Sequence, residues 1–121
     1  MTFLEGNIME NQRNDLVSLI DKFFVPAAAK TEFYQMIAMN RGFLQKLPGF
    51  IEDAHYEHSD EQGNLRYVTV AAWGSTQAID SAKEAVQAEY ERQGFDAATM
   101  IERLGITIDR GIYREVELQT I

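Results

Sequence analysis

Two kinds of apolar pattern follow one another and predict the first strand and the first helix. Residues 15–25 are rich in β-branched and aromatic side chains, which favour a strand, and Pro26 ends it. Pro26 can also open a helix, because its missing N–H would be unpaired there. Residues 27–47 then repeat apolar positions at helical spacing until Pro48-Gly49 stops the helix. The repeating positions are Phe33, Met36, Ile37, Leu44 and Leu47.

A hairpin is predicted next. Residues 50–59 and 65–73 have strand character, and the polar segment 60–64 between them is a tight turn. Gly63 suits the left-handed position that follows a type I turn. This turn places the two strands in one register, and the register decides which of their side chains share a face.

Two helices and a last strand complete the pattern. Ser75 is predicted to cap a helix over residues 76–93, which carries one apolar face. Asp96 is predicted to cap a shorter helix after it. The final strand covers residues 106–116 and is interrupted by Gly111, which predicts a β-bulge.

The order of elements is therefore β-α-β-β-α-β with one short additional helix, the arrangement of a ferredoxin-like α+β fold. We expect a four-stranded antiparallel sheet with the helices over one face. Residues 15–121 are predicted to form this single domain, and residues 1–14 an N-terminal extension without firm structure. A chain of 121 residues can bury a core without disulfides or metals.

The predicted strands are apolar on both sides, which bears on quaternary structure. The alternating residues of the first strand are Leu16, Ile20 and Phe24 on one side, and Val17, Leu19, Phe23 and Val25 on the other. Since the helices can cover only one face of the sheet, the other face needs a second cover. A second copy of the protein is the simplest cover, so we expect a homodimer.

Composition and charge narrow the class of protein. With 45% hydrophobic and 25% charged residues, the chain has the balance of a globular protein. Its net charge of −8 and scattered Lys and Arg argue against a nucleic-acid partner. Because there is no cysteine, disulfides and thiolate metal sites are excluded. The first residues do not resemble a secretion signal, and no apolar stretch is long enough for a membrane span, so a cytoplasmic protein without a membrane partner is expected.

Two short motifs carry a family resemblance: Leu47-Pro48-Gly49-Phe50 after the first helix and Ala72-Trp73-Gly74-Ser75 at the end of the third strand. With these motifs in this order of elements, the chain resembles the antibiotic biosynthesis monooxygenase (ABM) family over residues 16–116. The resemblance implies a dimeric α/β barrel with a ligand cleft between the sheet and the helices of each protomer. Activities in this family include cofactor-free oxygenation of phenols to quinones, haem degradation, and isomerisation or breakdown of small carbonyl compounds.

The resemblance carries over to few side chains. Trp73 matches a tryptophan that lines the cleft in several catalytic members. Haem-degrading members also use an asparagine on the first strand and a histidine on the second helix. Residues 16–25 contain no Asn and residues 76–93 contain no His, which argues against haem degradation. No bound cofactor is expected for the leading activity described below. The Asn, Tyr and Arg that quinone-forming members place around their tryptophan are not assigned to positions of this chain.

His55 is the predicted acid–base residue, and Trp73 is the second predicted catalytic residue. The odd spacing of His55 and His58 sends them to opposite faces of their strand. In the register of the turn, His55 falls opposite Thr69 on the face that carries Trp73, where an imidazole could move a proton. Alternatively, His55 is a solvated or hydrogen-bonded residue of an edge strand, and Trp73 only packs the second helix onto the sheet.

Aromatic and polar neighbours complete the predicted site. The predicted substrate-binding residues are Phe33, Met36, Tyr67, Trp73 and Tyr90. The alternative is that these side chains only fill the core, as aromatic and methionine residues commonly do. Asp53, His55 and Glu57 share a strand face, but alternate strand positions stand about 7 Å apart. That spacing is too wide for one ion, so no metal site is predicted and a polar cleft lining is expected.

The leading hypothesis is a cofactor-independent monooxygenase that acts on a small aromatic or conjugated substrate. Such chemistry needs a pocket that binds an electron-rich, deprotonatable ring and admits dioxygen, and it needs few catalytic side chains. One alternative is an isomerase or lyase of a small carbonyl compound, with His55 moving a proton. Another is a non-catalytic dimeric binding module whose cleft is filled by its own side chains.

Overall fold

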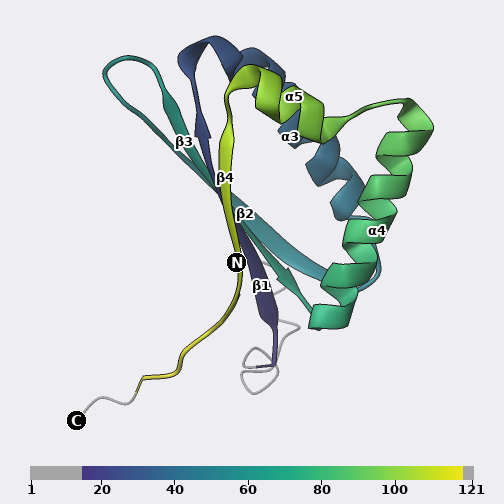
Figure 1. Ribbon diagram of the computed structural model, residues 1–121. Helices are drawn as coiled ribbons and strands as arrows, with labels where there is room; N and C mark the ends of the chain where they lie inside the picture. The colour runs from purple at the N-terminus through teal and green to yellow at the C-terminus, as the bar shows by residue number, and fades with distance from the viewer. Residues whose placement is uncertain (1–14, 119–121) are drawn as a thin grey trace.

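The computed structural model describes residues 15–118 and contains one four-stranded antiparallel sheet with helices over one face (Figure 1). The strand order is β2-β3-β1-β4, and every neighbouring pair is antiparallel, as in the ferredoxin-like fold expected from the sequence. The elements in chain order are β1 (Val17–Val25), the 3-10 helix η1 (Ala27–Ala29), α3 (Lys30–Leu44), β2 (Phe50–Ser59), β3 (Leu65–Trp73), α4 (Thr76–Gln93), α5 (Ala97–Leu104) and β4 (Thr107–Arg114).

The predicted elements are confirmed, with differences of detail; the last strand, expected to reach residue 116, ends at Arg114. The first helix begins as η1 and ends at Leu44, because Lys46 and Leu47 donate their N–H groups in tighter turns, to the carbonyls three residues before them. The bulge predicted at Gly111 is wrong, since the register of β1 and β4 runs without a shift through that position. Glycine at position 111 leaves room for a neighbouring ring, because a Cβ there would lie 3.0 Å from Cε1 of Tyr113. The irregularity of the sheet lies in β2, between residues 50 and 52.

The two motifs that carry the family resemblance meet in space. The N–H of Gly74 donates to the carbonyl of Gly49 over 2.9 Å, and the rings of Phe50 and Trp73 pack edge to face with centroids 5.4 Å apart. Gly49 has a φ of +85°, and a Cβ there would lie 2.5 Å from the Cβ of Ala78 at the start of α4. Glycine is therefore required where α4 approaches the end of β2. Together these contacts fix the position of Trp73.

The core lies between the sheet and the helices in two clusters. One cluster surrounds the rings of Phe33 and Tyr67, which pack edge to face at 5.1 Å, and it is closed by α5 through Met100. The other surrounds Trp73 and includes Ile79 of α4. A cavity borders both clusters, and it is the natural place to look for a site.

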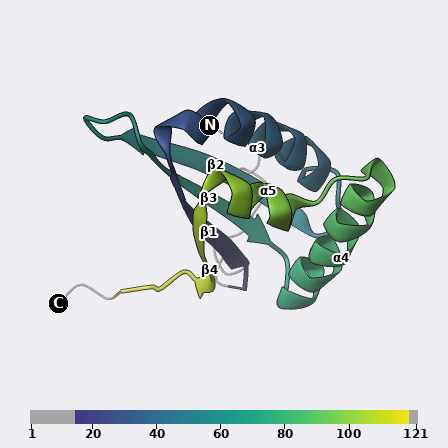
Figure 2. The same ribbon diagram turned by 45° about the horizontal axis from the view of Figure 1, so that its top comes forward.

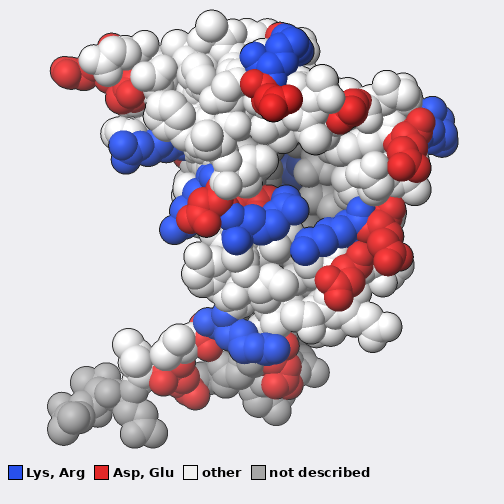
Figure 3. All heavy atoms as spheres, viewed as in Figure 1, with Lys and Arg blue, Asp and Glu red and all other residues white. Residues whose placement is uncertain are grey.

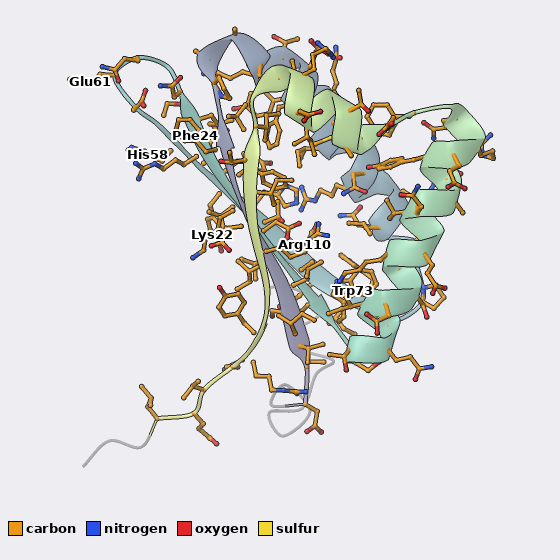
Figure 4. The ribbon with its side chains drawn as sticks, in the orientation of Figure 1. Lys22, Phe24, His58, Glu61, Trp73 and Arg110 are labelled. Carbon is orange, nitrogen blue, oxygen red and sulfur yellow. The ribbon has the colours of Figure 1, made fainter. Side chains whose placement is uncertain are left out.

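The opposite face of the sheet carries no helix in the described part of the chain (Figures 1 and 2). Phe24 and Lys22 point away from the helices on this face (Figure 4). Phe24 is 40% exposed and Tyr56 is 60% exposed. The expectation that the strands are apolar on both sides is thus confirmed for this face; its apolar residues are Ile20, Phe24, Ala54, Tyr56, Val68, Val70 and Tyr113. Between residues 15 and 118, no helix has the length and hydropathy needed to cross a membrane.

Candidate functional site

A cavity of about 100 Å³ lies between the sheet and the two longer helices. In the space-filling view a hollow opens between the sheet and α4, with charged side chains around its rim (Figure 3). Much of the cavity lining is apolar, which suits a flat organic ligand. The apolar lining residues are Leu19, Ala71 and Trp73 from the sheet, and Ile37, Leu44 and Ile79 from the helices.

A row of polar residues crosses the cavity face of the sheet, one from each strand. His55 of β2 pairs with Thr69 of β3, Thr69 pairs with Asp21 of β1, and Asp21 pairs with Arg110 of β4. All four residues line the cavity. The strands place them there because residues that pair across neighbouring strands point to the same face. In the two central strands, β1 and β3, this row interrupts side chains that are otherwise apolar or aromatic, and such a polar row is where binding or chemistry is expected.

Both ring nitrogens of His55 have a polar neighbour, a hydrogen-bond partner at Nδ1 and a carboxylate near Nε2. Its Nδ1 lies 2.7 Å from the hydroxyl of Tyr67, and its Nε2 lies 3.4 Å from Oδ2 of Asp53. The carboxylate can only accept, so Nε2 carries the hydrogen of the neutral ring and Tyr67 O–H donates to Nδ1. Arg41 of α3 in turn donates from Nε and Nη2 to Asp53 over 2.9 and 2.8 Å. The result is a connected chain from Arg41 through Asp53 and His55 to Tyr67.

The surroundings of these groups determine their protonation at neutral pH. Burial, joined by the charge of Arg41, lowers the pKa of His55 below its ordinary value, although Asp53 opposes this shift. Burial also raises the pKa of the Tyr67 phenol. A hydrogen bond of 2.6 Å to Glu57 raises the pKa of Tyr34 to about 12. At neutral pH His55 is therefore an uncharged base, and both phenols keep their protons.

A second arginine–carboxylate pair lies at the other side of the polar row. Arg110 donates from Nε and Nη2 to Asp21 over 2.7 and 2.8 Å, and Asp21 is only 7% exposed. This hydrogen bonding raises the pKa of Arg110. Sequence reasoning missed the pair, although Asp21 gave a signal: it interrupts the alternating apolar residues of β1 on the helix-facing side. Figure 4 shows Arg110 and Trp73 on the side of the sheet that carries the helices.

Trp73 is both a core residue and a wall of the cavity. It is 1% exposed and packs within its cluster, yet its indole lines the cavity. Its Nε1 is buried and has no hydrogen-bond partner among the described residues, and the same holds for Oδ1 of Asn40 on α3. Asn40 also lines the cavity and was not singled out from the sequence, because an isolated Asn on a helix is most simply explained as a surface residue.

A wider groove of about 480 Å³ runs along α3 outside the cavity. It shares Ile37, Arg41 and His55 with the cavity, and it adds the hydroxyl-bearing rings of Tyr34 and Tyr67. His55 therefore lies at the junction of an inner, largely apolar cavity and an outer, more open groove.

The remaining predicted residues lie away from the cavity. Phe33 and Met36 are buried in the first core cluster and do not border it, and Tyr90 lines a separate groove between α3 and α4. Their assignment to substrate binding stays a prediction that these positions do not support. His58 is exposed on the other face of the sheet, opposite Arg66. Within residues 15–118, no group of three or more His, Asp and Glu residues is arranged to hold a metal ion.

Comparison with known proteins gives matches of structure. No protein-family model and no curated protein matches the sequence. SnoaB, a cofactor-independent oxygenase from Streptomyces nogalater, is 24% identical, with 86% of this chain and 96% of that chain covered and a TM-score of 0.65. MhuD, a heme-degrader from Mycobacterium tuberculosis, is 22% identical, with 86% and 99% covered and a TM-score of 0.57. A dimeric ferredoxin-like protein from an uncultured marine organism is 6% identical, with 86% and 97% covered and a TM-score of 0.59.

Other matching structures carry an inferred assignment as antibiotic biosynthesis monooxygenases. The structure neighbours are thus ABM-like ferredoxin-fold proteins, as the two sequence motifs indicated. The likeness covers most of the chain and confirms the predicted fold. At these sequence identities it establishes the fold alone, so a function must be argued from the side chains of the site.

Proposed function

We propose that this protein is a member of the ABM family and a cofactor-independent monooxygenase of a small hydroxylated aromatic compound, which binds in the cavity between sheet and helices. The observation that carries the proposal is the placement of His55 beside a cavity that Trp73 also lines, with its Nδ1 hydrogen-bonded to Tyr67 and its Nε2 3.4 Å from the carboxylate of Asp53. A neutral histidine held by a carboxylate is a suitable general base for a phenol.

The first step is removal of a proton from the substrate. The substrate hydroxyl lies at the junction of cavity and groove and gives its proton to the oxygen of Tyr67, while Tyr67 passes its own proton to Nδ1 of His55. The imidazolium that forms is stabilised by Asp53, 3.4 Å from Nε2. The raised pKa of Tyr67 suits it to relay a proton, because the phenol does not stay ionised between turnovers.

The second step is oxidation of the ring by dioxygen. The phenolate gives up two electrons to dioxygen, and a C–O bond forms at a ring carbon. The peroxide anion that results takes back the proton held by His55, through Tyr67, and becomes a hydroperoxide. The O–O bond then breaks, the C–H proton of that carbon is lost, and water leaves with a carbonyl in its place. For a phenol this consumes one dioxygen and yields one quinone and one water. The electrons come from the substrate, so the protein has to supply only the base and the oriented pocket.

The same chain of residues also favours a second function. A base at His55 that returns its proton to a neighbouring carbon would isomerise a small carbonyl compound without dioxygen. Measuring dioxygen consumption together with product formation separates the two functions. Uptake that matches product supports the monooxygenase, whereas equal product formation under nitrogen supports the isomerase.

The open face of the sheet supports a homodimer. Its apolar side chains, including Phe24 and Tyr56, stand out to solvent in a single copy. Such a face is stabilised by burial against a second copy about a two-fold axis. A structure neighbour described as dimeric is consistent with this arrangement. We place the protein in the cytoplasm, because a chain without cysteine gives no sign of an oxidising compartment.

A further inference from the structure

Asp53 lies between two side chains that can carry a positive charge, Arg41 of α3 and His55 of its own strand. Arg41 engages both carboxylate oxygens: Nη2 donates to Oδ1 over 2.8 Å, and Nε donates to Oδ2 over 2.9 Å. Nε2 of His55 lies 3.4 Å from Oδ2, which is longer than an ordinary N–H···O hydrogen bond. The carboxylate is therefore held mainly by Arg41, and His55 has the weaker contact.

The burial of Asp53 makes this division important. Its side chain is 7% exposed, so water solvates little of its charge and a nearby cation has to balance it. Arg41 supplies that cation and does not lose its proton in the pH range of proteins. Without Arg41, the carboxylate would turn to the N–H of His55, and an opposite charge at short distance favours the imidazolium. An imidazolium cannot accept a proton from a substrate.

We propose that Arg41 is a positioning residue for His55: it holds Asp53 by both oxygens and so keeps the carboxylate from closing on Nε2. His55 then remains an uncharged base at neutral pH, whereas Asp53 and His55 alone would form a carboxylate–imidazolium pair. The inference rests on the proposed function in that it takes His55 as the base of the site. It concerns how the protonation of His55 is set, and not which reaction follows.

The electrostatics of the site support this role. Burial is the larger cause of the lowered pKa of His55, and the charge of Arg41 is the second cause, while Asp53 opposes both. The phenols beside His55 keep their protons at neutral pH, and the ion pair farther along the polar row balances its own charges. The cavity residues of α4 are the apolar Ile79, Ala82 and Val86. The other titratable or charged groups on the elements around His55 are Tyr34, Glu57, Tyr67, Asp21 and Arg110.

The protonation of His55 can be measured by NMR titration of the unliganded protein. The chain has two histidines, so His58→Gln identifies the imidazole signal of His55. Arg41→Met removes the charge and both hydrogen bonds, and the midpoint of the His55 titration should move up by about one pH unit. In Asp53→Asn the midpoint should move down, because Arg41 remains and the negative charge that favours the imidazolium is gone. A pair that only packs α3 on the sheet gives no reason for opposite shifts from its two members.

Two further variants control for charge and for structure. Arg41→Lys keeps the charge but replaces the planar fork by a single ammonium, so its midpoint should lie between those of Arg41→Met and the unsubstituted protein. Arg103→Met is the matched control, because Arg103 also donates to a carboxylate of α3, Glu32, over 2.8 Å, and neither residue lines the cavity or the groove along α3. It should leave the midpoint of His55 unchanged. If Arg41→Met does not fold, Arg41→Lys and Asp53→Asn carry the same test.

The pH dependence of phenol oxidation gives a second readout. The acid limb of the rate profile of Arg41→Met should move to higher pH together with the titration. The loss of rate should then reach about tenfold in acid, and the rate should return at alkaline pH, where His55 is again uncharged. An equal loss of rate at every pH would instead mean that Arg41 has only a structural role.

Several results would overturn the inference. They are an unchanged or lower midpoint in Arg41→Met, a higher midpoint in Asp53→Asn, and a shift in Arg103→Met as large as that in Arg41→Met. Oxidation of a phenol by a protein whose midpoints do not move would overturn the role of Arg41 alone. Failure of the proposed function looks different: the midpoints move as predicted, and no dioxygen is consumed with any phenol.

Discussion

The hydroxyl of Tyr67 lies 2.7 Å from Nδ1 of His55, a contact that joins β3 to β2 on the cavity face. The two residues are diagonal neighbours, because His55 pairs with Thr69 and Tyr67 pairs with Glu57. The contact leaves Nε2–H of the imidazole directed at Asp53 and so selects one tautomer. A ring held in this way is neutral and ready to accept a proton, and this has a consequence for stability.

The stability of the protein should fall in mild acid because of His55. Its pKa in the folded protein is lowered from 6.5, mainly by burial, so the unfolded chain takes up this proton more readily. The free energy of unfolding should therefore decrease as the pH falls from about 6.5 toward the lowered pKa, and His55 should add no pH dependence above that range. Urea unfolding at pH 8, 6.5 and 5 measures this change.

The variant His55→Gln should lose the part of the pH dependence that comes from His55. The difference in free energy of unfolding between the variant and the unsubstituted protein should therefore become smaller as the pH falls. His58→Gln is the control, because His58 is exposed on the opposite face of the sheet. If this difference in free energy of unfolding instead increases as the pH falls, the folded protein stabilises the protonated ring of His55. That result would contradict the interpretation of His55 as a neutral base.

The pair of Asp21 and Arg110 should be a sensitive point of stability. Arg110→Met leaves a carboxylate that is 7% exposed without its cation, and we expect a loss of about 2–3 kcal/mol. The expected loss is no larger than the usual loss for a fully buried pair. The Arg110 side chain is 48% exposed, so water already screens part of its interaction with Asp21. The double variant Asp21→Leu with Arg110→Met should recover much of the loss, since no unpaired charge remains.

Urea unfolding of the single and double variants measures this difference. Arg92→Met is the matched control, because the pair of Arg92 and Glu89 lies at the surface of α4 and its loss should change stability much less. If Arg110→Met and Arg92→Met have equal effects, the charge of Asp21 is solvated and the interior polar row does not exist as described.

The open face of the sheet should mediate dimer formation. Sedimentation equilibrium at micromolar concentration should give a mass near twice the 13.8 kDa of one chain. Phe24→Glu places a charge on the proposed interface and should shift the protein to monomers, whereas Met39→Glu on α3 changes an equally exposed apolar residue on the helix side and should not. A monomeric unsubstituted protein would refute the dimer.

The protein should not bind haem tightly, although MhuD shares its fold. The chain has two histidines, both on β2, and the Nδ1 and Nε2 of His55 are already directed at Tyr67 and Asp53. Titration with haem should produce no sharp Soret shift at stoichiometric ratios, with apomyoglobin as the positive control. Tight binding followed by bleaching on addition of a reductant would assign the protein to haem degradation.

The position of His55 in the site could be predicted from the hairpin turn that contains Gly63. Gly63 has a φ of +84°, and the turn around it pairs Asp60 with Asn64, which is the register that the sequence predicted. That register alone placed His55 opposite Thr69 and on the face of Trp73. Local turn chemistry could therefore predict this half of the site, because the strands of a hairpin are close in sequence.

The other half depends on contacts between distant parts of the chain. Asp21 and Arg110 are 89 residues apart, and only the pairing of β1 with β4 brings them together. Nothing local indicates that pairing, although a charged residue among apolar ones was visible at Asp21. The place of Asn40 in the cavity lining depends likewise on how α3 packs on the sheet, and helical periodicity predicts only which residues share a helix face. Helical periodicity correctly predicted that Phe33 and Met36 lie on the buried face of the first helix. It could not show whether a residue on that face packs in the core or lines the cavity.

The central claim is that a base at His55 drives oxidation of a phenol by dioxygen, and the most direct test is an oxygen-electrode measurement with 1-naphthol. We predict that the protein, treated with a chelator, consumes one dioxygen for each 1,4-naphthoquinone formed. His55→Gln should slow this at least about a hundredfold. Trp73→Phe should slow it while the fold persists, and His58→Gln should not slow it. No uptake above the rate without protein, or an unchanged rate in His55→Gln, would contradict the proposed function.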